Sequence, residues 1–495
     1  MAKAETFQDL ALKPRRDGEE RWRWLYGELR AAILEGRLKA GARMPSTRSL
    51  AAQYDLSRGT IVVAFEQLRS EGYVTAESGA GTFVASGLPD RSMVAKTLHR
   101  APALPRSTAS LSKRGRTIVD GIHVLPPSRS MGKAFRLHEP AIDLFPIDLW
   151  SRVAGRVLRR VPRSLYGQGD VAGYLPLRKA IAEYVGPARG VRCEASQVIV
   201  TSGAQQALDL VARILLDPED RVWLEDPGYP GARAVFRGAG AELVPVPVDD
   251  EGLDLRYGLK QASTPKVVYT TPANEFPLGI TMSLDRRLAL LKWAAEAGVW
   301  IVEDDYDAEY RYSGRPLAAL QSLDRSGCVV YIGTFTKLLF NALRVGFLIV
   351  PERVVDAFQA VRSFVDRHHP TLDQAILAEF IHEGHFGHHV RRMRQTYAER
   401  MSTLLEAGRK EMVGLLEISE AHAGMRTLGW LQTRRSDAAA AQKARAYGLE
   451  LAALSEFSIR HFHAPALLLG FAACSAAELR RGISVLATAL SDTRS

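Results

Sequence analysis

The chain has 495 residues and a formal net charge of +10; 46% of the residues are hydrophobic and 24% are charged, the mix of a globular protein of two or three domains. Its three cysteines form no Cys-x-x-Cys pair, which argues against a disulfide framework and a cysteine metal site and suits a reducing compartment. The N-terminus lacks the apolar stretch of a signal peptide, and the longest apolar run, 464–474, contains Pro465 and is too short to span a bilayer. We therefore expect a cytoplasmic protein with no membrane partner.

Composition divides the chain into a compact head (18–86), a linker (87–137) and a long body (138–495). Residues 91–140 contain ten lysines and arginines against two acids, Asp120 and Glu139, together with several prolines and serines. This composition predicts a flexible, basic linker. Its charge either solvates an unstructured tether or contacts DNA phosphates, and the sequence leaves both interpretations open.

The head has the pattern of three short helices followed by a β-hairpin. An apolar stripe of Leu25, Leu29 and Ile33 marks the first helix, and serines before the second and third helices are placed as N-caps. In chain order the predicted elements are a helix over 22–33, a helix over 47–54 after Ser46, a helix that begins after Ser57 and ends near Gly72, and strands over 73–75 and 81–84. Two short helices joined by a tight turn suit insertion into the major groove of DNA.

Polar residues around the predicted third helix and the hairpin are the candidates for DNA contact. The N-terminus of that helix favours phosphate, and Gly59 allows a close approach of the backbone. The candidate residues are Ser46, Arg48, Ser57, Arg58, Thr60, Gly79, Gly81 and Thr82. Segment 41–84, with its Pro-Ser-Thr-Arg and Ser-Arg-Gly-Thr motifs, resembles the winged helix-turn-helix of the GntR superfamily. The alternative is a small helical domain that binds other proteins.

The body alternates short β-branched or aromatic runs with Ala- and Leu-rich stretches, which predicts an α/β fold with buried parallel strands. The runs are 197–200, 221–224, 266–269, 299–302 and 329–332. Polar motifs follow several of them. Thr-Ser-Gly-Ala-Gln-Gln (201–206) opens a helix with small residues whose N–H groups can bind a phosphate, and the turn at 225–230 presents Tyr229.

Two further motifs of the body carry charge. The strand near residue 300 runs into four acids within 303–307, which are costly unless they are exposed or paired with a cation. A protonated pyridine nitrogen would be such a cation, whereas a metal site would require histidines or further carboxylates nearby, so no metal is expected. The strand near residue 331 ends at Lys337, which follows two threonines and precedes Arg344. This arrangement predicts a lowered lysine pKa and reactivity towards an aldehyde.

Together these motifs resemble the fold-type I aminotransferases, which bind pyridoxal phosphate (PLP), from about residue 140 to the end. With the head, the chain resembles the MocR/GabR family of regulators. The resemblance implies a winged helix-turn-helix joined to a large α/β, aminotransferase-like domain that forms a homodimer. It assigns Lys337 to the Schiff base, Asp304 to the pyridine nitrogen, Tyr306 and Asn274 to the ring hydroxyl, Tyr229 to stacking, Gly203, Ala204, Gln205, Thr334 and Arg344 to the phosphate, and Tyr174 to the phosphate bound by the partner subunit.

The chain departs from the family pattern at two places. Asn274 and Glu275 stand where the family usually has His-Gln, and we expect Glu275 to change the charge of the pocket. Aminotransferases also hold the substrate carboxylate with an arginine in a late strand, and 466–471 contains none. Arg426 or Arg460 are the candidates to replace it. This loss bears on transamination of α-amino acids more than on cofactor binding.

The resemblance implies a PLP-dependent regulator of transcription that senses a small amine, an amino acid or PLP itself through an aldimine at Lys337. Its partners would be double-stranded DNA with repeated half-sites, the effector and a second copy of the chain. A working aminotransferase with an accessory DNA-binding head is the alternative. A body that has lost PLP and serves only for dimerisation is the third interpretation.

Overall fold

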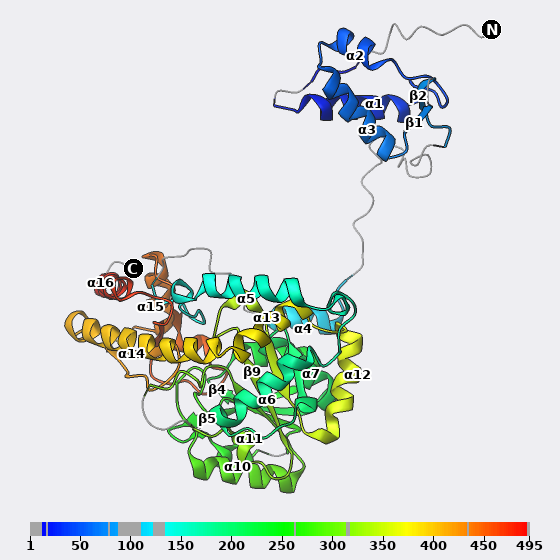
Figure 1. Cartoon of the computed structure of the whole chain (residues 1–495). Coiled ribbons are helices and arrows are strands. Elements are labelled where there is room, and N and C mark those ends of the chain that lie inside the picture. The colour runs from blue at the N-terminus through cyan, green and yellow to red at the C-terminus, as the bar shows by residue number, and fades with distance from the viewer. Residues whose placement is uncertain are drawn as a thin grey trace. The chain divides into compact units, whose positions relative to one another are not determined.

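The computed structural model describes residues 12–15, 18–77, 80–87, 110–121, 134–261, 264–312, 317–432 and 435–492. The chain forms two compact units, Met1–Ala109 and Ser110–Ser495 (Figure 1). None of the helices in these ranges combines the length and the apolar character that crossing a bilayer requires.

The head contains the predicted three helices and hairpin. They are α1 (Arg21–Leu34), α2 (Thr47–Tyr54), α3 (Arg58–Ser70), β1 (Val74–Glu77) and β2 (Gly81–Val84). Ser46 and Ser57 cap α2 and α3 as predicted, because each hydroxyl accepts a hydrogen bond of 3.1 Å from the backbone N–H three residues later. Leu25, Leu29 and Ile61 are among the fully buried residues of the core, and β1 and β2 pair antiparallel.

The body is built on an eight-stranded sheet. In spatial order its strands are β3 (Val198–Thr201), β10 (Gly346–Ile349), β9 (Val329–Thr334), β8 (Trp300–Asp305), β7 (Val267–Thr270), β4 (Arg221–Asp226), β5 (Glu242–Asp249) and β6 (Gly252–Leu253). All five predicted runs are strands. β5, β6 and β10 were not among the predicted runs, and β10 is antiparallel to both of its neighbours. The connection of 335–345 between β9 and β10 contains no crossover helix of the kind that parallel strands need.

Helices surround this sheet, and a second, four-stranded sheet with the order β11-β12-β14-β13 follows near the C-terminus (Figure 1). The helices are α5 (Ile147–Arg160), α6 (Leu175–Arg189), α7 (Ala204–Leu215), α8 (Pro230–Ala239), α9 (Leu255–Leu259), α10 (Leu284–Ala297), α11 (Leu320–Leu323), α12 (Val355–Val365), α13 (Thr371–His382), α14 (His385–Glu411), α15 (Asp437–Ala446) and α16 (Ala476–Ser491). The small sheet consists of β11 (Leu416–Ile418), β12 (Arg426–Leu431), β13 (Ala452–Ala453) and β14 (Ala466–Gly470). Leu208, Phe236 and Phe358 belong to one buried cluster with residues of the main sheet.

Two stretches of the predicted flexible linker have defined structure. Lys113–Gly121 form helix α4, which packs against α8. Phe135 is fully buried and forms a β-bridge with Gly470 of the small sheet. The prediction of an unstructured linker is therefore wrong at these two stretches, because apolar side chains there find partners on the body. The remainder of the linker, 88–109 and 122–133, lies outside the described residues.

Candidate functional site

A cavity of about 250 Å³ lies at the carboxyl ends of β8 and β9, the edge at which open α/β sheets bind ligands. Most of the predicted cofactor residues line it: Gly203, Ala204, Gln205, Tyr229, Asp304, Tyr306, Thr334, Lys337 and Arg344. Five residues that sequence reasoning missed complete the lining: His138, Tyr269, Thr271, Phe276 and Thr336. Asn274 and Tyr174 do not line it.

Lys337 is the lysine that lines this cavity. Its Nζ donates a hydrogen bond of 2.6 Å to the backbone carbonyl of His138. The pKa of Lys337 is lowered to about 8: burial is the largest cause, Asp307 opposes it, and the positive charge of Arg344 acts in the same direction as burial. The direction agrees with the prediction, although burial is the larger cause. A lower pKa increases the fraction of neutral amine, the form that attacks an aldehyde.

Asp304 presents an acceptor to the cavity. Its Oδ2 accepts a hydrogen bond of 2.8 Å from Tyr269, while its buried Oδ1 has no partner among the described residues. Burial raises the pKa of Asp304 to about 7 despite the Tyr269 hydrogen bond. A buried oxygen without a partner is costly, and a protonated pyridine nitrogen would supply the missing donor. The site therefore fits the positive ring nitrogen of PLP.

The neighbouring acids Glu303 and Asp305 bind other parts of the chain instead. Glu303 accepts hydrogen bonds of 2.7 and 2.8 Å from the backbone N–H groups of Leu320 and Gln321 at α11. Asp305 forms a buried ion pair of 2.7 Å with Arg189. Successive residues of a strand point to opposite faces, which separates Asp304 from these two. Within the described ranges no group of three His, Cys, Asp or Glu side chains could hold a metal.

The start of α7 forms the end of the cavity that the sequence predicts to bind phosphate. Gly203 is the N-cap of α7 and has a φ of +123°, a conformation that favours glycine. A Cβ there would lie 3.3 Å from the Arg344 guanidinium, so glycine also allows that guanidinium its position. The free N–H groups of the first helical turn suit an anion. Thr336 adds a buried hydroxyl with no partner in the described part of the chain.

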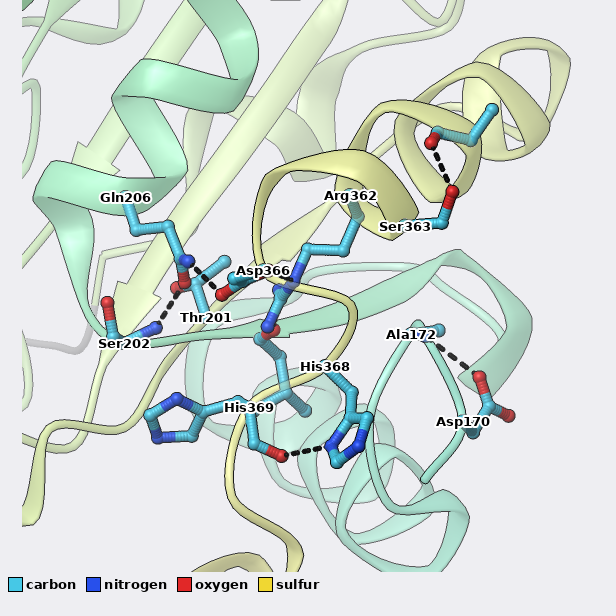
Figure 2. A network of polar contacts seen from close by, with 12 residues as sticks. Asp170, Ala172, Thr201, Ser202, Gln206, Arg362, Ser363, Asp366, His368 and His369 are labelled. Atoms are coloured by element: carbon cyan, nitrogen blue, oxygen red, sulfur yellow. Dashed lines mark hydrogen bonds and ion pairs between the residues drawn. The ribbon is translucent and has the colours of Figure 1, made fainter. Parts of the chain in front are cut away.

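A partly buried polar network holds the loop at Ser202 in place (Figure 2). The Gln206 side chain accepts a 2.7 Å hydrogen bond from the Ser202 N–H and donates to Asp366. Asp366 also accepts from Arg362 at 2.8 Å, and Arg362 donates in turn to the Val200 carbonyl at the end of β3. Arg362 is fully buried, whereas Asp366 is 30% exposed, and together they tie the loop to the end of α12.

Tyr306 lies in the cavity wall with Asn274 behind it. The Tyr306 hydroxyl donates a 2.7 Å hydrogen bond to the Asn274 carbonyl, and the Asn274 Nδ2 is 3.3 Å from that hydroxyl. Asn274 also donates to Asp307 at 2.8 Å. In the conformation described, Asn274 therefore positions Tyr306, and its own contact to a cofactor stays a prediction.

The two candidates for the missing carboxylate-binding arginine differ in position. Arg426, at the start of β12, is buried, donates to the Tyr306 hydroxyl at 2.6 Å and lies 4.3 Å from the Phe276 ring centre. Arg460 is exposed, and its backbone N–H is held by Asp226 at 2.7 Å. Arg426 is thus the cation beside the cavity.

Glu275 does not act as predicted. Its side chain accepts from the Leu278 N–H at 2.7 Å and does not line the cavity. Burial raises the pKa of Glu275 well above its usual value, and the neighbouring Glu225 raises it further. The expectation that Glu275 changes the charge of the pocket therefore finds no support, because its side chain lies outside the cavity lining and burial disfavours its charged form.

The cavity-lining residues that sequence reasoning missed differ in how clearly the sequence marks them. Tyr269 is the last residue of a predicted strand, and Thr336 belongs to the motif that ends in Lys337, so both could have been found. Phe276 directly follows Asn274 and Glu275, so it too could have been found, whereas His138 belongs to no motif. Tyr174, predicted to reach the partner subunit, is the N-cap of α6 and donates its backbone N–H to Gln374 at 2.8 Å.

The predicted DNA-contacting residues gather at the starts of α2 and α3 and on the hairpin. Arg48 and Arg58 are exposed, whereas the Ser57 and Thr60 hydroxyls lie 2.8 Å apart and bond to each other. Gly81 and Thr82 lie on β2, and Gly79 falls outside the described residues. Val62 and Val63, 42% and 45% exposed on α3, were missed. Apolar side chains on such a helix can contact thymine methyl groups.

Comparisons with known proteins agree with both units. The family model for aminotransferase class I and II matches residues 153–486, and that for bacterial regulatory proteins of the gntR family matches residues 23–84. The chain is 40% identical over 472 residues to the probable rhizopine catabolism regulatory protein MocR of Rhizobium meliloti. The match covers 94% of this chain and 93% of that protein. It is 36% identical over 395 residues to the HTH-type transcriptional regulator TauR of Rhodobacter capsulatus, 76% of this chain and 77% of that one.

The body is also similar to solved aminotransferases. LysN, the alpha-aminoadipate aminotransferase of Thermus thermophilus, solved with N-(5'-phosphopyridoxyl)-L-leucine, has a TM-score of 0.67 and 29% identity and covers 77% of this chain and 94% of its own. The chain therefore belongs to the MocR-type transcriptional regulators, in which a GntR-family DNA-binding head is joined to a body with the fold of the PLP-dependent aminotransferases.

Proposed function

We propose that DNA binding by this regulator responds to a small amine, an amino acid or PLP held at Lys337. The observation that carries the proposal is the meeting of three groups in one cavity: Lys337 with its lowered pKa, Asp304 with a free buried oxygen, and Arg344 at the start of α7. A surface lysine would have neither the burial nor the opposing acid.

PLP is the cofactor that these residues fit. Lys337 would hold its aldehyde carbon, Asp304 its ring nitrogen, and the loop at Gly203 with Arg344 its phosphate. When bound, PLP supplies an aldehyde that condenses reversibly with primary amines. The residues of the chain orient that aldehyde towards Lys337 and exclude water from it, because the surrounding Tyr229 and Phe276 rings form an apolar wall.

The chemical class of the effector follows from the charged residues at and beside the cavity. The amine must reach the place of the Lys337 Nζ, and Arg426 lies beside the cavity as a buried cation. We therefore favour an amine that also carries an acidic group, since such a group would meet Arg426. An amine without that group would bind through the aldehyde alone.

A homodimer would present two heads to repeated half-sites. Support comes from large exposed apolar residues on and around α5 and α6, among them Ile147, Tyr166 and Leu175, which are 60%, 61% and 45% exposed in the single chain. A patch of such residues would be typical of an interface. Tyr174, next to Leu175, would then face the site of the second copy. Binding to chromosomal DNA would require the protein to be in the cytoplasm.

A working aminotransferase is the second candidate, favoured by Lys337 and Asp304 together with Arg426. Steady turnover of an amino donor and a keto acid would support it.

Footprinting tests the proposal directly. The purified, PLP-loaded protein is placed on the DNA upstream of its own gene, with and without a panel of amines. Protection of repeated half-sites that changes with one amine supports the regulator. An absence of sequence-specific protection, with steady transamination in the same preparation, favours the enzyme.

A further inference from the structure

The chain between head and body is anchored on the body through helix α4. Ser112 begins this helix, because its hydroxyl accepts a 2.9 Å hydrogen bond from the Gly115 N–H. The helix packs against α8, where the Ile118 side chain lies over Gly238. A Cβ on Gly238 would lie 3.0 Å from Ile118 Cγ1, closer than such contacts normally come. The missing side chain at 238 thus makes room for Ile118.

Helix α8 connects this contact to the cavity. Its N-cap is Tyr229, whose ring lines the cavity. Gln205, also in the cavity wall, donates a 3.3 Å hydrogen bond to the Gly231 carbonyl in the first turn of α8. The helix has ten residues, so its ends are about 15 Å apart. A displacement of Tyr229 or Gln205 would therefore move the surface on which Ile118 rests.

Further along the chain, His138 lines the cavity directly. Residues 134–139 lead into the body, and the His138 carbonyl accepts the 2.6 Å hydrogen bond from Lys337 Nζ. The His138 ring stacks on Phe276, with ring centres 5.4 Å apart. The Lys337 amine keeps all of its N–H groups for this hydrogen bond only while no other group is bonded to Nζ. The contact therefore depends on the state of Lys337.

We propose that residues 113–121 and 134–139 relay the state of the cavity to the head, through docking of α4 on α8 and through the contact between His138 and Lys337. The inference rests on the proposed sensing function and adds the path by which the state of the cavity reaches the head. Occupation of the cavity changes the docking of α4, and this changes the length of chain between the head and its anchor on the body. A ligand acts on the head only to the extent that it prefers one docking state.

Limited trypsin digestion measures this docking, because α4 contains Lys113, Arg114 and Arg116. Cleavage at these sites is followed by mass spectrometry in cofactor-free and PLP-loaded full-length protein. We expect the rates to differ by about threefold or more between the two states, since cleavage follows the population of the open form. Equal rates in the two states would overturn the relay.

Two variants and a control locate the effect. Ile118→Asp should raise cleavage and abolish its dependence on PLP, and Gly238→Leu, which fills the same space from α8, should do the same. Val119→Asp places the same charge on the exposed side of α4, where Val119 is 61% exposed, and should behave as wild type. Dependence on PLP that persists in Ile118→Asp and Gly238→Leu would contradict the inference.

DNA affinity, measured on the same proteins with and without PLP, separates this inference from the proposed function. A wild-type affinity that does not respond to PLP or any amine counts against the sensing function. A response that persists in Ile118→Asp leaves sensing intact and refutes the relay. A response lost in Ile118→Asp and kept in Val119→Asp supports both.

Discussion

Replacing Asp304 with alanine should weaken PLP binding severely. Asp304 is 4% exposed, and its Oδ1 is the buried acceptor on the cavity side of β8. Removing one partner of a buried charged pair costs roughly 3–5 kcal/mol, and about 1.4 kcal/mol corresponds to a tenfold change. The ring nitrogen of PLP can instead lose its proton, which limits the loss. We therefore expect the low end of this range, a dissociation constant raised about 100-fold.

The assay is a titration of cofactor-free protein with PLP, followed by the absorbance of the bound form. Glu303→Gln is the matched control, because Glu303 is equally buried in β8 but faces α11. It should bind PLP as wild type does, although it loses one acceptor for a backbone N–H. Wild-type affinity in Asp304→Ala, or an equal loss in Glu303→Gln, would refute the assignment of Asp304.

Three further outcomes are expected. With a Lys337 pKa of about 8, the rate at which Lys337 captures PLP should rise about tenfold from pH 7 to pH 9 and then level off, because the neutral amine reacts; a rate still rising steeply above pH 9 would indicate an ordinary lysine. Arg426→Met should weaken the response to amino acids about tenfold or more and spare simple amines, and equal effects on both would exclude a carboxylate contact. Arg58→Ala should cost about 1–3 kcal/mol of operator binding if Arg58 reads a base, whereas Arg69→Ala, at the far end of α3, should cost less; an unchanged footprint removes Arg58 from the interface.

Features set by neighbouring residues could be predicted from the sequence. Ser46 and Ser57 cap their helices through bonds to residues three positions away, so the pattern of the head is local. The cavity could be anticipated for a different reason. Parallel strands bring their carboxyl ends to one edge, so motifs at the ends of separate strands converge there. Lys337 and Asp304 meet because each ends its strand on that edge.

Contacts between distant segments could not be predicted in this way. His138 precedes Lys337 by 199 residues, and the contact depends on the path of a segment that has no motif. Arg426 reaches Tyr306 from the small C-terminal sheet. In the sequence, Ile118 belongs to a segment predicted to be a flexible linker, and only the structure shows that it packs over Gly238. Composition describes a segment by itself and cannot reveal the surface that receives it.

The central claim is that the chemistry at Lys337 controls DNA binding. Its most direct test is the operator affinity of PLP-loaded wild type and Lys337→Ala, each titrated with the amine that alters the footprint. We predict that the wild-type affinity changes by roughly 5- to 150-fold, the usual range of coupling between two sites. Lys337→Ala should bind the same DNA through its intact head but not respond to the amine. An equal response in both proteins would contradict the account.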